Sequence, residues 1–307
     1  MTSIGMIGMT PGNGHPLSFS AIVNGFDPAT FPRGEFEMIH NYLSARSPDE
    51  FGVGGAKVTH VWTQDPETTA LISRACSIPN TVGDPVEMRG LVDALVIARD
   101  DPGSHVELAR PFLEHGTPVF VDKPLTMQPD ELGYFAGYLE QGLLMSSSGL
   151  RYATELDDVR AGTHELGEVL AIRGIVPNEW ERYGAHILDA VQGACGLHFT
   201  GVRRLSARHE CMLVETSEDV PVVVDALGMY KTPIAIDVLG TEQRLSRPLR
   251  DNFGAFRRLL GEFISMVHRH EPVVPAADTL RSVAVLIAGD LAPQDGGLKR
   301  LDEIIGR

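Results

Sequence analysis

Cysteine is scarce in this sequence, with only Cys76, Cys195 and Cys211 among 307 residues. Their number is odd, their spacing is wide and no C-x-x-C motif occurs, which argues against a disulfide framework and against a structural zinc site. Basic residues are also few, since 26 lysines and arginines stand against 41 acidic residues, for a formal charge of -15. This balance argues against a nucleic-acid partner and against an acidic membrane surface.

Long hydrophobic runs, repeats and low-complexity tracts are absent as well. No apolar run approaches the roughly 20 residues that a transmembrane helix needs, and the first ten residues, MTSIGMIGMT, lack the basic segment of a signal peptide. We therefore expect a reduced, cytoplasmic protein that contains one large domain or two ordinary ones.

The first half of the chain alternates between predicted strands and helices. Apolar, β-rich runs occur at residues 4–9, 57–62, 95–98, 119–121 and 143–146, and segments of helical pattern separate them. This alternation predicts an α/β fold with a doubly wound parallel sheet of the Rossmann type over residues 1–148. Ligands bind such sheets at the carboxyl ends of the strands.

The turns after the first two strands have the residue types of a nucleotide site. The first turn, TPGNGHP, is rich in glycine and can direct main-chain N–H groups toward a phosphate, although its spacing is not G-x-G-x-x-G. An ordinary glycine-rich turn is the alternative interpretation. Thr63 stands where an NAD-binding protein usually has an acid for the ribose, and Asp65 is better explained as a helix N-cap.

The segment VFVDKP at 119–124 ends a buried strand on a lysine. Pro124 stops the strand because it lacks an N–H group, so Lys123 is expected at the carboxyl edge of the sheet, where a surface lysine is the alternative. Ser104 and Glu107 match a capping box, which predicts a helix start there. Residues 25–55 are irregular and predict a surface excursion or a lid.

The second half changes character near Gly149. Runs of alternating pattern at 169–176, 203–207, 212–215, 220–227 and 234–239 predict an antiparallel or mixed sheet over residues 149–307. Residues 185–191 read as helical, so His186 and Asp189 share a helix face. A core or capping histidine is the alternative for His186. Two amphipathic helices at 253–267 and 280–287 close the chain.

These motifs, taken in order, resemble the Gfo/Idh/MocA oxidoreductase family over nearly the full length. VDKP at 121–124 resembles the family's E-K-P motif, with Asp122 as the acid, and His105 fits the histidine after the fourth strand. SGLRY at 148–152 resembles the segment that joins two domains, and GAHILD at 184–189 resembles the G-x-H-x-x-D helix. Residues 233–242 resemble the family's late-sheet segment.

The resemblance implies a Rossmann domain, a C-terminal α/β domain with an open and largely antiparallel sheet, and NAD or NADP as cofactor. Lys123 would hydrogen-bond the reacting hydroxyl, and His186 would be the general acid/base. The sheet would join subunits into a homodimer or homotetramer. Cofactor contacts are expected from Gly8, Thr10, Gly12, Asn13, Gly14, Thr63, Gln64, Arg99, Asp100, His105, Asp122 and Lys123, and substrate contacts from Arg151, Arg182, Tyr183 and Asp189.

The chain departs from the family pattern at the glycine turn, at Thr63 and at Arg182, where many relatives have an aspartate four residues before the histidine. Three functions therefore stay open. The first is a dehydrogenase or reductase of a sugar, nucleotide sugar or cyclic polyol. The second is a non-redox protein that senses a dinucleotide or metabolite, and the third is elimination or hydrolysis through transient oxidation by bound NAD.

Overall fold

The chain divides into two units in this computed structural model, which describes residues 1–230 and 232–306. The first unit comprises Met1–Leu125, Phe135–Ser146 and Phe256–Pro275, and the second comprises Thr126–Tyr134, Ser147–Ala255 and the chain from Ala276 onward. Two helices, α5 (Pro129–Glu140) and α8 (Asn252–Arg269), have residues in both units. The predicted domain boundary after residue 148 stays a prediction.

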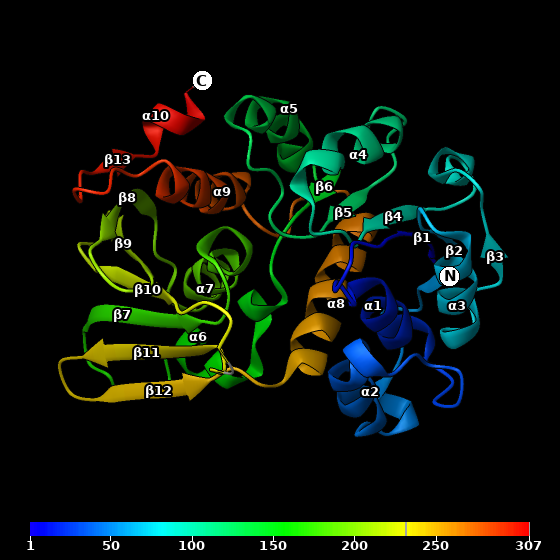
Figure 1. Cartoon of the computed structure of the whole chain (residues 1–307), viewed down its shortest axis with the longest axis horizontal. Coiled ribbons are helices and arrows are strands. Elements are labelled where there is room, and N and C mark those ends of the chain that lie inside the picture. The colour runs from blue at the N-terminus through cyan, green and yellow to red at the C-terminus, as the bar shows by residue number, and fades with distance from the viewer. Residues whose placement is uncertain (231, 307) are drawn as a thin grey trace. The chain divides into compact units, whose positions relative to one another are not determined.

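The first unit is built on a six-stranded parallel sheet, which confirms the predicted Rossmann architecture (Figure 1). The strand order is β3-β2-β1-β4-β5-β6, so the order reverses at β1, and ligands bind at such a switch point. The strands are β1 (Ser3–Ile7), β2 (Lys57–Trp62), β3 (Asn80–Thr81), β4 (Ala94–Ile97), β5 (Val119–Val121) and β6 (Leu144–Met145).

The helices of the first unit follow the strands. The α-helices are α1 (His15–Asn24), α2 (Glu37–Ser44), α3 (Pro66–Ala75) and α4 (His105–Leu113), and the 3-10 helices are η1 (Gly34–Phe36), η2 (Pro48–Glu50), η3 (Pro85–Met88) and η4 (Pro102–Ser104). Asp65 caps α3 by accepting the N–H groups of Glu67 and Thr68, as predicted. The predicted helix start at Ser104 is confirmed, because Ser104 is the N-cap residue of α4. The capping-box hydrogen bonds are absent, because the Ser104 hydroxyl donates to the carbonyl of Asp101 instead.

The core of the first unit lies on both faces of its sheet. Phe19 of α1 packs against Phe120 of β5 with ring centroids 6.2 Å apart, and Phe263 of α8 lies 5.8 Å from the same ring. Figure 1 shows α4 on the face opposite α1. The strands β4 and β5 are therefore buried throughout, which explains their uninterrupted apolar sequence.

The second unit is built on a seven-stranded sheet with the order β12-β11-β7-β10-β9-β8-β13. Its pairs are antiparallel except for β7 with β10, so the predicted mixed sheet is confirmed. The strands are β7 (Val169–Val176), β8 (Phe199–Leu205), β9 (Glu210–Thr216), β10 (Val222–Ala226), β11 (Ala235–Gly240), β12 (Arg244–Pro248) and β13 (Lys299–Arg300).

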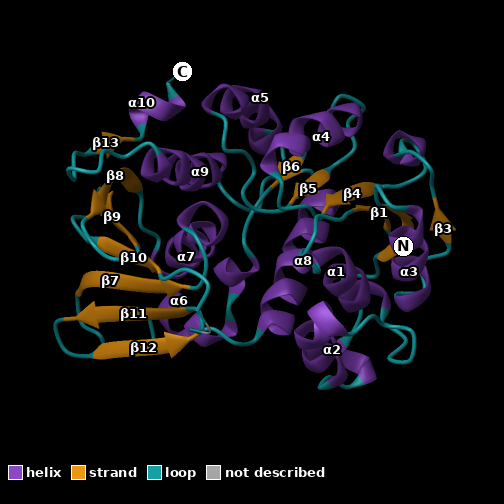
Figure 2. Cartoon of the chain, in the orientation of Figure 1, coloured by secondary structure: helices purple, strands orange, loops and turns teal. Residues whose placement is uncertain are grey.

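One face of this sheet is covered by the helices α7 and α9, which lie side by side (Figure 2). The close approach of α7 needs Gly174, where a Cβ atom would meet Ile187 at 2.3 Å. Trp180 joins the two helices by donating its indole N–H to the carbonyl of Leu286 at 3.0 Å. The helices are α6 (Asp157–Arg160), α7 (Trp180–Cys195), α9 (Ala276–Asp290) and α10 (Asp302–Ile305), with η5 (Gly149–Tyr152) and η6 (Thr154–Leu156) before them.

Residues 25–55 form a packed layer beside α1. The side chains of Phe36, Ile39 and Leu43 are buried, and a Cβ atom at Gly14 would meet the Ile39 side chain at 2.2 Å. The segment therefore covers the start of α1, and a lid function stays a prediction.

Candidate active site

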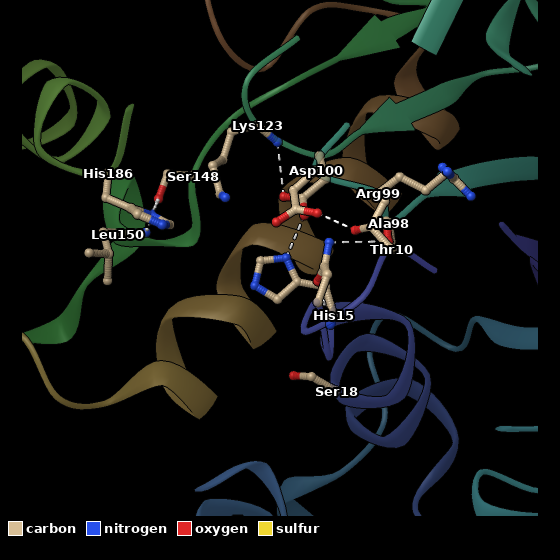
Figure 3. A network of polar contacts seen from close by, with 12 residues as sticks. Thr10, His15, Ser18, Ala98, Arg99, Asp100, Lys123, Ser148, Leu150 and His186 are labelled. Atoms are coloured by element: carbon tan, nitrogen blue, oxygen red, sulfur yellow. Dashed lines mark hydrogen bonds and ion pairs between the residues drawn. The ribbon is translucent and has the colours of Figure 1, made fainter. Parts of the chain in front are cut away.

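The carboxyl edge of the parallel sheet brings together the four turns that are expected to bind a cofactor. All six strands run in the same direction, so the turns after β1, β2, β4 and β5 meet at one edge. Within this edge, the Thr10 hydroxyl donates to Asp100, which joins the turn after β1 to the turn after β4 (Figure 3). Asn13 accepts the N–H of His15 at 2.9 Å and thereby shapes the start of α1.

The glycines of the first turn serve three different local needs. A Cβ atom at Gly8 would collide with the ring of Pro16 at 2.4 Å, and one at Gly14 would collide with α2. Gly12 has a φ of +77° and open space around its missing Cβ. The turn therefore has room for a ligand beside Gly12, next to the N-terminus of α1, where a phosphate is favoured.

Gln64 holds the main chain of this turn. Its amide oxygen accepts the N–H of Met9 at 3.1 Å, and its amide nitrogen donates to the carbonyl of the same residue. The oxygen also accepts from Arg99 at 3.0 Å, and Arg99 makes two further contacts with Asp101 at 2.7 and 2.6 Å. Gln64 and Arg99 thus fix the shape of the cofactor edge.

Thr63 and His105 belong to the same edge, but their polar atoms contact the protein. The Thr63 hydroxyl donates to the carbonyl of Asp65 at 2.7 Å and lies 2.8 Å from the Thr69 hydroxyl. Both ring nitrogens of the buried His105 lie near main-chain carbonyls, those of Leu125 at 2.9 Å and Arg99 at 3.2 Å. These two side chains support the edge, and a direct contact with a cofactor stays a prediction for each.

A histidine that sequence reasoning missed lies at the centre of this edge. The Nδ1 atom of His15 (Figure 3) is 2.5 Å from the Oδ2 atom of Asp122. The His15 ring stacks on Phe19. Asp122 is 2% exposed, and Lys123 beside it is 6% exposed. Burial alone would raise the pKa of Asp122, but the charge and hydrogen bond of His15 and the charge of Lys123 lower it to about 2.

Asp122 is therefore an ionised acceptor, so the proton shared with His15 belongs to the imidazole nitrogen. A buried ammonium, an ionised carboxylate and an imidazole thus adjoin one another at the end of β5. The bond from β5 into the next turn, between Lys123 and Pro124, is a cis peptide. Fixed charges of this kind suit a reaction in which a substrate oxygen gains or loses negative charge.

The second unit holds His186 in a separate network. Its Nδ1 atom lies 2.6 Å from the Ser148 hydroxyl, and the Asp189 carboxylate accepts the N–H of Ser148 at 2.5 Å and the Ser147 hydroxyl at 3.1 Å. Burial raises the pKa of Asp189, while the charge of Arg151 and the hydrogen bonds from Ser148 act in the opposite direction. Asp189 therefore fixes Ser147 and Ser148, and Ser148 in turn contacts the imidazole of His186. Substrate contact by Asp189 stays a prediction.

The other expected substrate residues lie around α7. Arg151 forms an ion pair with Asp278 at 3.0 Å. Tyr183 lies one turn before His186, with its ring edge-on to the imidazole at a centroid distance of 5.3 Å. Arg182 is exposed in the first turn of the same helix. Their roles toward a substrate stay predictions.

His15 and Ser148 escape prediction from sequence because each acts through a contact across a long stretch of chain. In the sequence pattern, His15 is only the residue before a helix-starting proline, and Ser148 is only part of a joining segment. The sequence offers one hint, since His15 directly follows the last glycine of the glycine-rich turn and Ser148 begins the segment expected to join the two domains.

A third polar cluster lies on the sheet of the second unit. Donor atoms of His209, Cys211 and Asp225 lie within 4.8 Å of one another, a spacing compatible with a metal ion. However, Arg173 donates to Asp225 at 2.6 Å and His209 lies 2.7 Å from its other oxygen. The carboxylate is thus already neutralised by a guanidinium, which favours a salt-bridge network. Across residues 1–230 and 232–306, no helix is long and apolar enough to cross a bilayer.

Residues 34–141 match the sequence model of the oxidoreductase family with an NAD-binding Rossmann fold, which confirms the resemblance to the Gfo/Idh/MocA family. The matched range contains the turns after β2, β4 and β5, including Lys123, and begins after the glycine turn. No curated protein sequence matches the chain significantly.

Solved structures of dehydrogenases share the fold across the whole chain. A scyllo-inositol dehydrogenase from Lactobacillus casei with bound NAD(H) and scyllo-inositol is 13% identical with a TM-score of 0.74, and the match covers 98% of this chain and 99% of that one. A myo-inositol dehydrogenase from Lactobacillus casei with NAD(H) and myo-inositol is 16% identical with a TM-score of 0.73, with coverages of 98% and 96%. An oxidoreductase from Agrobacterium radiobacter with NAD+, L-tartaric acid and magnesium is 14% identical with a TM-score of 0.73, with coverages of 98% and 99%.

Proposed function

We propose that this chain is an NAD(P)-dependent oxidoreductase that interconverts an alcohol and a carbonyl group on a cyclic polyol, a sugar or a nucleotide sugar. The observation that carries the proposal is the buried Lys123 ammonium beside the ionised Asp122, at the carboxyl end of β5. The family match and the inositol dehydrogenases of the same fold support the same chemistry.

The cofactor would lie along the edge at which β1 meets β4. The open space at Gly12 and the start of α1 suit the diphosphate, and Gln64 keeps the main chain of the turn in place. When bound, the nicotinamide supplies hydride chemistry. The protein would supply the rest: Lys123 of the first unit would fix a substrate oxygen, and His186 of the second unit would act as an acid, base or hydrogen-bond donor.

The test is a screen of inositols, hexoses and nucleotide sugars with NAD+ and NADP+, followed by Lys123→Met in the active combination. The variant is expected to lose at least about 1000-fold in turnover while cofactor affinity changes by less than about threefold, because the methionine keeps the buried stem and removes the charge. A Lys57→Met control, at an exposed lysine of β2, should keep the wild-type rate. Full turnover by Lys123→Met would show that the assigned role is wrong.

A non-redox sensor on the same scaffold is the second candidate. It is favoured by the inward-facing Thr63 hydroxyl and by Arg182 in place of the aspartate of many relatives. A sensor would bind a dinucleotide or metabolite without any absorbance change at 340 nm in the screen. A homodimer or homotetramer joined through the second sheet, and a cytoplasmic location, also stay proposals.

A further inference from the structure

The hydroxyl group of Ser148 is buried beside the imidazole of His186. Ser148 is 1% exposed, and its oxygen already accepts the N–H of Leu150 at 3.2 Å (Figure 3). In the part of the chain that the structure describes, the hydroxyl's other hydrogen-bonding contact is the Nδ1 atom of His186 at 2.6 Å. A buried hydroxyl that cannot donate loses its hydration without compensation, so its proton belongs in the contact with His186.

We propose that Ser148 is a positioning residue that holds His186 as the neutral tautomer with its proton on Nε2. If Nδ1 carried the proton, it would donate to Ser148, and the Ser148 O–H would then be buried with no acceptor. If Ser148 donates, both groups are satisfied. In a neutral histidine ring, the hydrogen bond made by one nitrogen determines whether the other nitrogen carries the proton. Here the partner of Nδ1 is a donor, so Nε2 carries the proton.

Asp189 makes this arrangement rigid. It lies one turn after His186 on α7 and accepts the Ser148 N–H and the Ser147 hydroxyl. The carboxylate therefore fixes the serine, and the serine hydroxyl in turn contacts the imidazole. A carboxylate at Nδ1 would place the proton on Nδ1 and leave Nε2 as a base, whereas the serine has the opposite effect.

The consequence for the reaction rests on the proposed function. With its proton on Nε2, His186 offers a substrate oxygen a hydrogen-bond donor and keeps that proton, as a neutral imidazole that stabilises negative charge. When bound, the reduced dinucleotide would supply the hydride that the carbonyl carbon gains in the reducing direction. Lys123 would supply the proton for the resulting alkoxide and become a neutral amine, and the oxidising direction would reverse each transfer.

Nitrogen-15 NMR of the full-length protein, labelled at histidine, tests the tautomer directly. Two-bond couplings to the ring protons show which nitrogen carries the proton, and His186→Gln identifies the signals of this ring. At neutral pH, the wild type should show a protonated Nε2 and an unprotonated Nδ1. A protonated Nδ1 in the wild type would overturn the proposal. The tautomer is read in the wild-type protein, and His186→Gln serves to assign its signals.

Ser148→Ala and Ser148→Thr then test the role of the hydroxyl. The alanine variant should lose the single tautomer and show averaged or exchanged nitrogen shifts, while threonine, which keeps the hydroxyl, should restore the wild-type pattern. An unchanged spectrum in a folded Ser148→Ala would overturn the proposal. Neither substrate nor cofactor is needed, so a failure of the oxidoreductase assignment would not alter these spectra.

Discussion

Asp122→Asn should remove a pH-dependent part of the stability of the first unit. The pKa of Asp122 is lowered from its ordinary value of 3.8 to about 2, by the charges of His15 and Lys123 against the opposing effect of burial. This difference corresponds to about 2 kcal/mol of stability at neutral pH, since one pKa unit is worth roughly 1.4 kcal/mol. Because the folded-state pKa is the lower one, the contribution is complete above about pH 5 and is lost as the pH falls toward 2.

The assay is urea unfolding of wild type and Asp122→Asn at several pH values, followed by the fluorescence of Trp62, which lies in the same unit. The wild type should exceed the variant by about 2 kcal/mol at pH 7 and by about half of that at pH 3. Glu140→Gln, at an exposed acid of the same unit, is the matched control. A difference between wild type and Asp122→Asn that stays constant from pH 7 to pH 3 would refute the reasoning.

Two further predictions concern packing and the cofactor edge. Gly174→Ala should lower the stability of the second unit by about 1–3 kcal/mol, because the added Cβ would overlap Ile187. Gly133→Ala, on the exposed side of α5, should instead raise stability by up to about 1 kcal/mol, because alanine favours the helix and nothing lies near its Cβ. Both changes are measured in the same urea denaturation assay. Gln64→Ala should weaken NADH binding about tenfold with little change in Tm, because it releases both main-chain polar groups of Met9. Unchanged NADH affinity of this variant in a fluorescence titration would show that the Gln64–Met9 hydrogen bonds are not needed for cofactor binding.

The sequence pattern is sufficient to predict the architecture of the first unit. Apolar runs, each ending in polar or glycine-rich turns, indicate buried parallel strands, and parallel strands necessarily bring their carboxyl ends to one edge. For that reason the pattern alone places Lys123, Gln64 and Arg99 near one another. The capping box at Ser104 failed because a local motif does not show whether the serine instead bonds the preceding turn.

Contacts between distant residues cannot be predicted in the same way. His15 and Asp122 are 107 positions apart, and Ser148 and His186 are 38 apart, so no local spacing relates them. The short strands β12 and β13 also escape prediction, because their residues are largely polar and exposed and their pairing comes from the neighbouring strand. Single polar side chains of this kind become interpretable only when the fold has placed their partners.

Cofactor titration of the purified protein tests the central proposal most directly. NADH should quench protein fluorescence and gain fluorescence of its own on binding, and it should bind more tightly than NADPH, because Arg99 is already paired with Asp101 and is not available to a 2′-phosphate. Failure of a folded preparation to bind either dinucleotide would contradict the assignment of the β1–β4 edge as a cofactor site, and with it the proposed oxidoreductase.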